Sequence, residues 1–212
     1  FGKSYLSAWL LLINAIQSES KDVFYVAPTF QQGKDIMWSL LKELGQDLIA
    51  AAHENTATLT LINGRKIYIK GSDRPDTLRG NAASFLVLDE YSSMKPVVWE
   101  QILRPVLADV RGSCLMISTP AGKNHFYDTY NDALEDDDWD AFQFNSTDNP
   151  FLPEDEVEAA RKNMSSMAFR QEFEASFETG SGGIFNESWF KVDDEPEEGN
   201  FVIAVDPAGY EA

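Results

Sequence analysis

Cysteine is nearly absent from this sequence of 212 residues: Cys114 stands alone, so the chain cannot form an internal disulfide. A chain without disulfides is typical of a reducing, intracellular setting. Long apolar runs are missing too, because the longest, residues 8–16, is interrupted by Asn14 and is too short to span a bilayer. No signal-peptide pattern is visible. Together these absences predict a soluble protein with no membrane partner.

Basic residues are scarce: 17 Lys and Arg face 35 Asp and Glu, which gives a formal net charge of −18 at pH 7. The imbalance is confined to the second part of the chain, since residues 1–131 hold 13 residues of each sign, whereas residues 132–212 hold 4 basic and 22 acidic ones. Acidic runs of this kind are typical of solvated surface and linkers. So acidic a chain argues against a protein that coats DNA broadly, but allows local phosphate contacts in the neutral part.

The sequence does contain enough apolar and aromatic material for a folded core. Apolar residues make up 43% of the chain, including 14 Phe, 7 Tyr and 5 Trp, which excludes a disordered chain. Short apolar runs typical of buried strands alternate with segments of helical periodicity, and this predicts an α/β fold with a mostly parallel sheet flanked by helices. We expect strands at residues 22–28, 84–92, 113–122 and 139–146, a hairpin at 57–71 around Asn63-Gly64, and helices at 5–17, 31–45, 123–134 and within 153–177.

The first four residues, FGKS, match the second half of a phosphate-binding loop, GxxxxGK[ST]. The first glycine of that pattern would lie about five residues before Gly2, so half of the pattern is missing. In a nucleotide-binding chain Lys3 contacts the β- and γ-phosphates, and the Ser4 hydroxyl coordinates Mg²⁺. The alternative is an ordinary helix start. A phosphate loop also leads directly into a helix, because the helix N-terminus faces the phosphates.

Two expected strands end in polar residues with the chemistry that nucleotide hydrolysis requires. In FLVLDE, Asp89 is placed to hold the magnesium ion and Glu90 to polarise the attacking water. In MISTP, Ser118 and Thr119 are placed to sense the γ-phosphate and to couple hydrolysis to movement. Ordinary strand-end turns are the alternative for both segments. Because parallel strands end at one edge of a sheet, we expect these side chains to lie near the phosphate loop, as in a P-loop NTPase.

Taken together, the segments resemble a known family over almost the whole chain. The chain is similar to the large terminase subunit of tailed bacteriophages in the order and approximate spacing of FGKS, APTFQQGKDIMW, DTLRGNAASFLVLDEYSSM, MISTPAGKNHFYDTY, NPFLPEDEVEAARKNMSSMAFRQEFEASF and FVIAVDPAG. The resemblance implies a RecA-like P-loop ATPase domain that drives double-stranded DNA into an empty capsid. It also implies a following ribonuclease H-like nuclease domain that cuts the genome.

The resemblance further implies roles for individual residues. Gly2, Lys3 and Ser4 match the phosphate loop of the family. Asp89 matches its magnesium-binding acid and Glu90 its catalytic acid, and Ser118 and Thr119 match its coupling motif. Arg79, eleven residues before Glu90, matches a basic position that in related ring motors acts on the ATP of a neighbouring subunit. A surface arginine before a turn glycine is the alternative there. Asp206, at the end of FVIAVD, matches the first metal-binding carboxylate of the nuclease.

On this resemblance the chain divides into an incomplete ATPase domain at residues 1–178, a flexible acidic linker at 179–199 and the start of the nuclease domain at 200–212. The implied cofactors are ATP with Mg²⁺, and Mg²⁺ or Mn²⁺ for the nuclease. The implied partners are double-stranded DNA, further copies of the chain in a homo-oligomeric ring, the portal protein and the small terminase subunit. The implied location is the procapsid portal in the cytoplasm of the host cell.

The sequence departs from the family pattern in ways that limit these expectations. The adenine-contacting segment and the strand before the phosphate loop are absent, so we expect a fragment that binds ATP poorly. A two-metal nuclease needs several carboxylates from separate elements, so Asp206 alone predicts no DNA cleavage. No dense basic stripe marks a path for DNA, and the candidate contacts are Lys66, Lys70, Arg74 and Lys95.

Two other functions stay open at this point. A helicase-like DNA translocase shares the phosphate loop, the acidic pair and a Ser-Thr motif, but it requires a second motor domain. A nucleotide-independent scaffold fits if the phosphate loop has decayed.

Overall fold

The computed structural model describes residues 2–19, 21–80 and 82–178. All of these residues fall within one structural unit, Phe1–Thr179. The expected linker at 179–199, the expected nuclease strand at 200–212 and Asp206 lie outside the described residues. Those three expectations therefore stay predictions.

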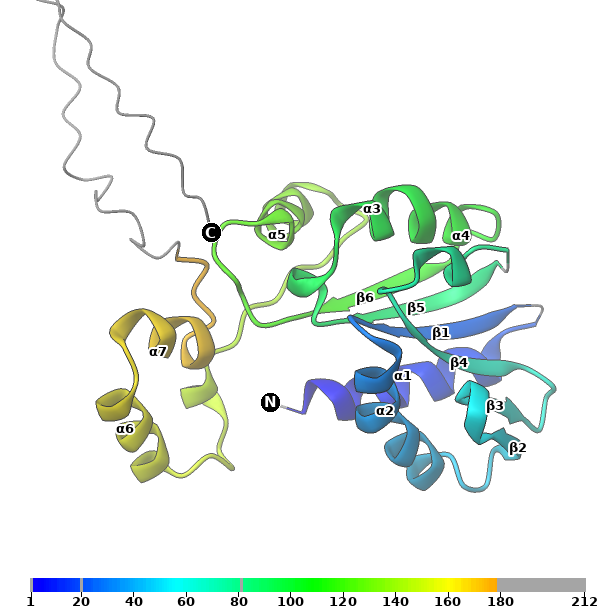
Figure 1. Ribbon diagram of the computed structural model, residues 1–212, viewed down its shortest axis with the longest axis horizontal. Helices are drawn as coiled ribbons and strands as arrows, with labels where there is room; N and C mark the ends of the chain where they lie inside the picture. The colour runs from blue at the N-terminus through cyan, green and yellow to red at the C-terminus, as the bar shows by residue number, and fades with distance from the viewer. Residues whose placement is uncertain (1, 20, 81, 179–212) are drawn as a thin grey trace, which may run out of the picture. The chain divides into compact units, whose positions relative to one another are not determined.

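A six-stranded sheet forms the centre of the described chain, with the strand order β2-β3-β4-β1-β5-β6 (Figure 1). β1 runs parallel to both β4 and β5, and β5 runs parallel to β6. β3 pairs antiparallel with both β2 and β4. The sheet is therefore mixed, and its parallel part carries the strands of the expected site. The strand bounds are β1 Asp22–Ala27, β2 Ile49–His53, β3 Thr58–Leu61, β4 Lys66–Gly71, β5 Ala83–Asp89 and β6 Ser113–Ile117.

Helices cover both faces of this sheet: α1 and α2 lie on one face, and α3, α4 and α5 lie on the other (Figure 1). None of the described helices combines the length and apolarity needed to cross a membrane. The α-helices are α1 Lys3–Gln17, α2 Phe30–Leu44, α3 Pro96–Val98, α4 Arg104–Ala108, α5 His125–Glu135, α6 Glu154–Asn163 and α7 Ser166–Phe173. The 3₁₀ turns are η1 Glu54–Thr56, η2 Pro75–Leu78, η3 Tyr91–Ser93 and η5 Ser146–Asp148, and η4 Trp99–Leu103 is a π-helical turn.

Side-chain alternation along the central strands divides the core into two layers. In β5, Phe85 and Val87 lie in the cluster under α1 and α2, whereas Leu86 and Leu88 lie in the cluster under α3 and α4. Successive side chains of a strand point to opposite faces of the sheet. Asp89 therefore continues the row of Phe85 and Val87, on the face that α1 covers.

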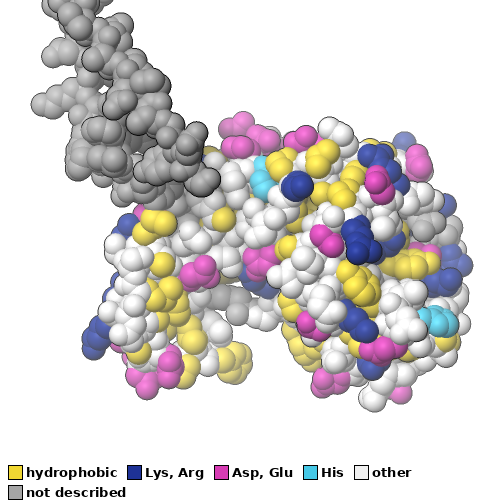
Figure 2. Space-filling view, viewed as in Figure 1, with side chains coloured by type: hydrophobic (Ala, Val, Ile, Leu, Met, Phe, Trp, Pro, Cys, Tyr) yellow, Lys and Arg dark blue, Asp and Glu magenta, His cyan; other side chains and the backbone are white. Residues whose placement is uncertain are grey.

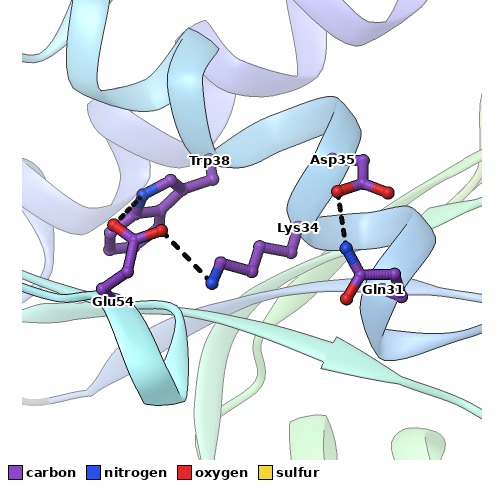
Figure 3. Close-up of polar contacts among 5 residues, drawn as sticks. All are labelled: Gln31, Lys34, Asp35, Trp38 and Glu54. Atoms are coloured by element: carbon purple, nitrogen blue, oxygen red, sulfur yellow. Dashed lines mark hydrogen bonds and ion pairs between the residues drawn. The ribbon is translucent and has the colours of Figure 1, made fainter.

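Polar contacts attach α2 to the turn η1 (Figure 3). Trp38 Nε1 donates a hydrogen bond to Glu54 Oε2 at 2.8 Å, and Lys34 Nζ lies 3.2 Å from Glu54 Oε1. Within α2, Gln31 Nε2 donates to Asp35 Oδ1 at 2.6 Å. The Lys34 ammonium group, followed by the Trp38 indole, lowers the pKa of Glu54. These contacts connect the outer part of the sheet to the helix that covers it.

Most expected elements are present, including the hairpin around Asn63-Gly64, which is β3 and β4. The expected parallel arrangement is confirmed for β4, β1, β5 and β6, and the antiparallel pairs lie at the β2-β3-β4 side of the sheet. β2 was not expected. Its central residues 50–52 are alanines, which favour helices, and only pairing with β3 makes them a strand.

The strand expected at residues 139–146 is wrong, because residues 139–145 form no strand and Ser146 begins η5. Phe142 and Phe144 do lie on the same side of the backbone, with their rings stacked at a centroid distance of 6.3 Å. They are 73% and 60% exposed. Alternation alone does not make a strand, since a neighbouring backbone must supply the hydrogen bonds. Here the Gln143 side chain instead donates to the Ala175 carbonyl oxygen at 2.8 Å.

Candidate active site

The N-terminus of α1 carries the first group of expected site residues. Gly2 precedes the helix in the left-handed region, at φ 71° and ψ 18°, a conformation that glycine adopts without strain. Lys3 and Ser4 form the first turn of the helix and are half-buried. The free N–H groups and the dipole of a helix N-terminus attract anions. A helix of 15 residues that begins with lysine and serine therefore has the groups needed for a phosphate.

The carboxyl end of β5 places the two acids in different environments. Asp89 is 5% exposed, and the Tyr25 hydroxyl donates a hydrogen bond to its Oδ2 atom. Burial, followed by the nearby charges of Asp89 and Glu90, raises the pKa of Tyr25, so its hydroxyl stays protonated and acts as a donor. Glu90 is half-buried and has a left-handed backbone, at φ 52° and ψ 48°. Non-glycine residues in this region are uncommon and gather at functional sites.

The ends of β5 and β6 are joined through the Glu90 carboxylate. Its Oε2 atom lies 3.3 Å from Ser118 Oγ and 3.4 Å from the Thr119 backbone nitrogen, and both groups donate to it. The residues that the sequence assigned to catalysis and to coupling are therefore in direct contact. This contact depends on the pairing of β5 with β6, which sets Asp89 opposite Ile117.

Ser92 completes this connection, although no sequence motif selected it. Its backbone N–H donates to Ser118 Oγ at 3.1 Å, and its hydroxyl donates to the Thr119 carbonyl oxygen at 3.0 Å. The two serine hydroxyl oxygens are 2.6 Å apart. Because Ser118 has one hydroxyl proton, the Ser92 hydroxyl, the Glu90 carboxylate and the Thr119 carbonyl oxygen compete for it. The Ser118 hydroxyl thus has acceptors both in the η3 turn and on the candidate catalytic carboxylate.

Lys3 and the residues that follow β6 line a common cavity of about 200 Å³. Lys3, Ser118 and Thr119 are among the residues that line it. Aromatic side chains from later in the chain also line it, among them Phe142 and Phe177. Phe177 in turn contacts the rings of Phe126, Tyr127 and Tyr130. The sequence indicated Lys3, Ser118 and Thr119 but not the lining residues that come from α5 and from the chain after it.

Not every expected site residue joins this group. Arg79, although it lies in the described part of the chain, does not line the cavity. Its side chain is 56% exposed, and its Nε atom lies 3.9 Å from Asp76 Oδ1. Ser4 follows Lys3 in the first turn of α1 but is not a lining residue of this cavity either. The structure therefore groups Lys3, Glu90, Ser118 and Thr119, and leaves Arg79 on the surface.

The donor set fits a magnesium ion that arrives with a nucleotide rather than one held by protein alone. The described residues contain no group of three or more His, Cys, Asp or Glu side chains able to hold a metal ion. Mg²⁺ at nucleotide sites is usually bound by one or two protein oxygens, with phosphates and water completing the shell. Asp89 and Ser4 offer oxygens of the required kind.

Comparison with known proteins gives a consistent result. Residues 1–192 match the family model described as terminase large subunit, T4likevirus-type, N-terminal. The large terminase subunit of Escherichia phage T5 is 30% identical over 195 residues, which cover 87% of this chain and 43% of that protein. The large terminase subunit of Thermus phage G20c is 30% identical over 132 residues, which cover 55% of this chain and 27% of that protein. The chain thus spans less than half the length of these curated relatives.

Solved structures share the fold. The large terminase ATPase domain of Thermus phage P74-26 superimposes with a TM-score of 0.73 at 23% identity, covering 83% of this chain and 84% of that one. The large terminase of a thermophilic bacteriophage, solved in complex with ADP, gives a TM-score of 0.70 at 18% identity, covering 84% of this chain and 46% of that one. The expected α/β fold of an ATPase domain is confirmed over the described residues.

Proposed function

Because the chain belongs to the T4likevirus-type family of terminase large subunits, we propose that it forms the ATP-hydrolysing motor of a viral DNA-packaging protein. The contact that carries this proposal is the one between Glu90 and the pair Ser118 and Thr119 at the ends of β5 and β6. The ADP complex of the similar terminase from a thermophilic bacteriophage supports a nucleotide as ligand. Family membership favours this function over a helicase-like translocase.

In the proposed reaction the N-terminus of α1 binds the phosphates. Lys3 contacts the β- and γ-phosphates with its ammonium group, and the backbone N–H groups of the first helical turn add donors. Ser4 and Asp89 would hold the Mg²⁺ ion that accompanies the nucleotide, and its charge would offset the negative charge of the phosphates. Lys3 lines the cavity that Ser118 and Thr119 also line, which supports a γ-phosphate position near the β6 end.

Glu90 orients and polarises the water that attacks the γ-phosphate. Its backbone is left-handed, and Ser118 and Thr119 hold its carboxylate from the end of the neighbouring strand. Loss of the γ-phosphate then changes the environment of the Ser118 hydroxyl. Because Ser118 is also bonded to Ser92, this change is passed to η3 and the start of the segment that leads to α3.

Glu90→Gln in the full-length gene product tests this role. The amide keeps the size of the side chain but cannot polarise water, so ATP binding by calorimetry persists while turnover falls by about 10²- to 10⁴-fold. Glu43→Gln is the matched control, because Glu43 is an exposed glutamate on α2. Undiminished turnover in Glu90→Gln contradicts the proposed role. Failure of the unaltered protein to bind ATP at millimolar concentration favours the nucleotide-independent scaffold.

The wider assembly is proposed on family membership. We place residues 1–178 in the ATPase domain, 179–199 in a linker and 200–212 at the start of a ribonuclease H-like nuclease, with Asp206 as one of its ligands for Mg²⁺ or Mn²⁺. The motor acts on double-stranded DNA as a homo-oligomeric ring, together with the portal protein and the small terminase subunit. Its location is the procapsid in the host-cell cytoplasm.

Arg79 is proposed to act on the ATP of a neighbouring subunit. Its side chain is exposed, and its ion pair with Asp76 at 3.9 Å is of the surface kind that contributes little stability. The side chain is therefore available to a partner at small cost. An arginine supplied from a neighbour stabilises the charge of the transition state.

The DNA contacts are proposed from charge alone. On the face shown in Figure 2, Lys and Arg side chains are scattered among acidic ones rather than gathered in one stripe. Lys66, Lys70, Arg74 and Lys95 are the candidates, and of these Lys70 is the least available. Its ammonium group donates to the Thr77 carbonyl oxygen at 2.7 Å and lies 5.1 Å from the Phe24 ring centroid.

A further inference from the structure

Tyr25 is a buried polar residue that neither the sequence motifs nor the proposed reaction accounts for. It lies in the middle of β1, an otherwise apolar strand after Asp22, and its side chain is fully buried. Its neighbour across the parallel ladder is Val87, two residues before Asp89 on β5. Since side chains two residues apart share a face, Tyr25 and Asp89 point to the same side of the sheet. The tyrosine hydroxyl reaches the carboxylate along this face.

The Tyr25 ring has a fixed position because α2 approaches the sheet closely above it. A Cβ atom added at Gly33 of α2 would lie 3.5 Å from Tyr25 Cε1 and 3.1 Å from both Ala27 Cβ and Ile69 Cγ2. Because Gly33 has no side chain, α2 can lie this close to the side chains of Tyr25, Ala27 and Ile69. The packed ring cannot turn away from Asp89 without moving its neighbours. The hydrogen bond is thus held by the core itself.

The Asp89 carboxylate is held by this hydrogen bond. Among the residues that the structure describes, Tyr25 is the one that donates a hydrogen bond to the Asp89 carboxylate, and it donates to Oδ2. No buried side-chain oxygen or nitrogen of the described residues lacks a partner. This bond reaches Oδ2 and leaves the other carboxylate oxygen, Oδ1, without a hydrogen bond to the described residues. One carboxylate oxygen is therefore held by a core residue.

We propose that Tyr25 is a positioning residue for the nucleotide-bound magnesium ion: its hydroxyl orients the Asp89 carboxylate so that Oδ1 is presented to the metal. The inference rests on the proposed function, because it assumes that Asp89 takes part in holding Mg²⁺. Partners that fix the orientation of a metal-binding side chain typically change metal affinity by about 10- to 100-fold when they are removed. Tyr25 thus contributes to magnesium binding without touching the ion.

The test measures magnesium affinity rather than turnover. A fluorescent ATP analogue is bound to the full-length gene product, and Mg²⁺ is titrated into the complex. We expect Tyr25→Phe, which removes only the hydroxyl, to weaken Mg²⁺ by about 10- to 100-fold, with nucleotide binding in EDTA unchanged. Tyr68→Phe is the matched control, because Tyr68 is a strand tyrosine of β4 that packs with the cluster on the opposite face. It should leave the magnesium titration unchanged.

Asp89→Asn and the double variant Tyr25→Phe/Asp89→Asn separate the outcomes. If Tyr25 acts through Asp89, the double variant has the same magnesium affinity as Asp89→Asn alone. This comparison also serves if Tyr25→Phe alone fails to fold, since the double variant removes the buried charge together with its donor. Unchanged magnesium affinity in a folded Tyr25→Phe, or a further loss in the double variant, overturns the inference but not the proposed function. Absence of magnesium-dependent nucleotide binding in the unaltered protein overturns the proposed function itself.

Discussion

Ser118→Ala tests the link between the two strand ends most directly, because Ser118 contacts both Glu90 and Ser92. Of the two donors among the described residues that reach the Glu90 carboxylate, the variant removes one and leaves the Thr119 backbone donor in place. It also removes the acceptor for the Ser92 backbone N–H. Glu90 is then held less firmly in the orientation that the proposed reaction requires. The expected result is slower hydrolysis with nearly unchanged ATP binding.

The size of this effect follows from the distances. A hydrogen bond to a charged group contributes about 1.5–3 kcal/mol. The 3.3 Å between Ser118 Oγ and Glu90 Oε2 is longer than a normal hydroxyl hydrogen bond, and Ser92 Oγ competes for the same proton at 2.6 Å. The lower end, about 1.5 kcal/mol, therefore applies. Because about 1.36 kcal/mol corresponds to a tenfold change in rate, we expect kcat to fall by about tenfold.

Steady-state ATP hydrolysis, with kcat and KM determined separately, measures this effect. Ser113→Ala is the matched control, since Ser113 is an exposed serine at the other end of β6. A kcat equal to that of the unaltered protein refutes the reasoning. So does a loss of the same size in Ser113→Ala, because the cause would then be the stability of the strand. A change confined to KM would assign Ser118 to binding rather than to the positioning of Glu90.

Two further predictions concern the subunit contact and the stability of the sheet. Mixing Arg79→Ala subunits with Glu90→Gln subunits should restore ATPase activity that neither variant has alone. In the mixture an Arg79→Ala subunit keeps its own Glu90 and receives Arg79 from a neighbouring Glu90→Gln subunit. An inactive mixture contradicts action in trans. The contacts with Lys34 and Trp38 lower the pKa of Glu54 below its ordinary value of 4.5. These contacts therefore stabilise the fold fully above about pH 4.5, and the stabilisation is lost as the pH falls through the lowered pKa. Thermal melting between about pH 6 and pH 3 should show a smaller loss in Glu54→Gln than in the Glu43→Gln control, and equal losses would show that Glu54 is not responsible.

The sequence by itself determined the elements whose formation depends on local chemistry. The apolar run before Asp89 became β5 because it is buried on both faces, and the run before Ser118 became the edge strand β6, which packs in part against both core clusters. The Asn63-Gly64 turn became a hairpin because these residues adopt the required backbone conformation. The helix that follows Gly2 was also indicated by its composition. The polar residues at these strand ends could be selected as a candidate site without a structure, because parallel strands end at a common edge.

Only the tertiary structure decided which side chains meet. The run at 139–146 alternates like a strand but has no partner strand among the described residues, whereas the alanines of β2 have one and pair with it. Tyr25 and Asp89 are 64 residues apart, and their contact requires β1 and β5 to be neighbours in a particular register. Ser92 reaches Ser118 for a similar reason. Strand order and register are set by the packing of whole layers, and no local pattern of residues contains that information.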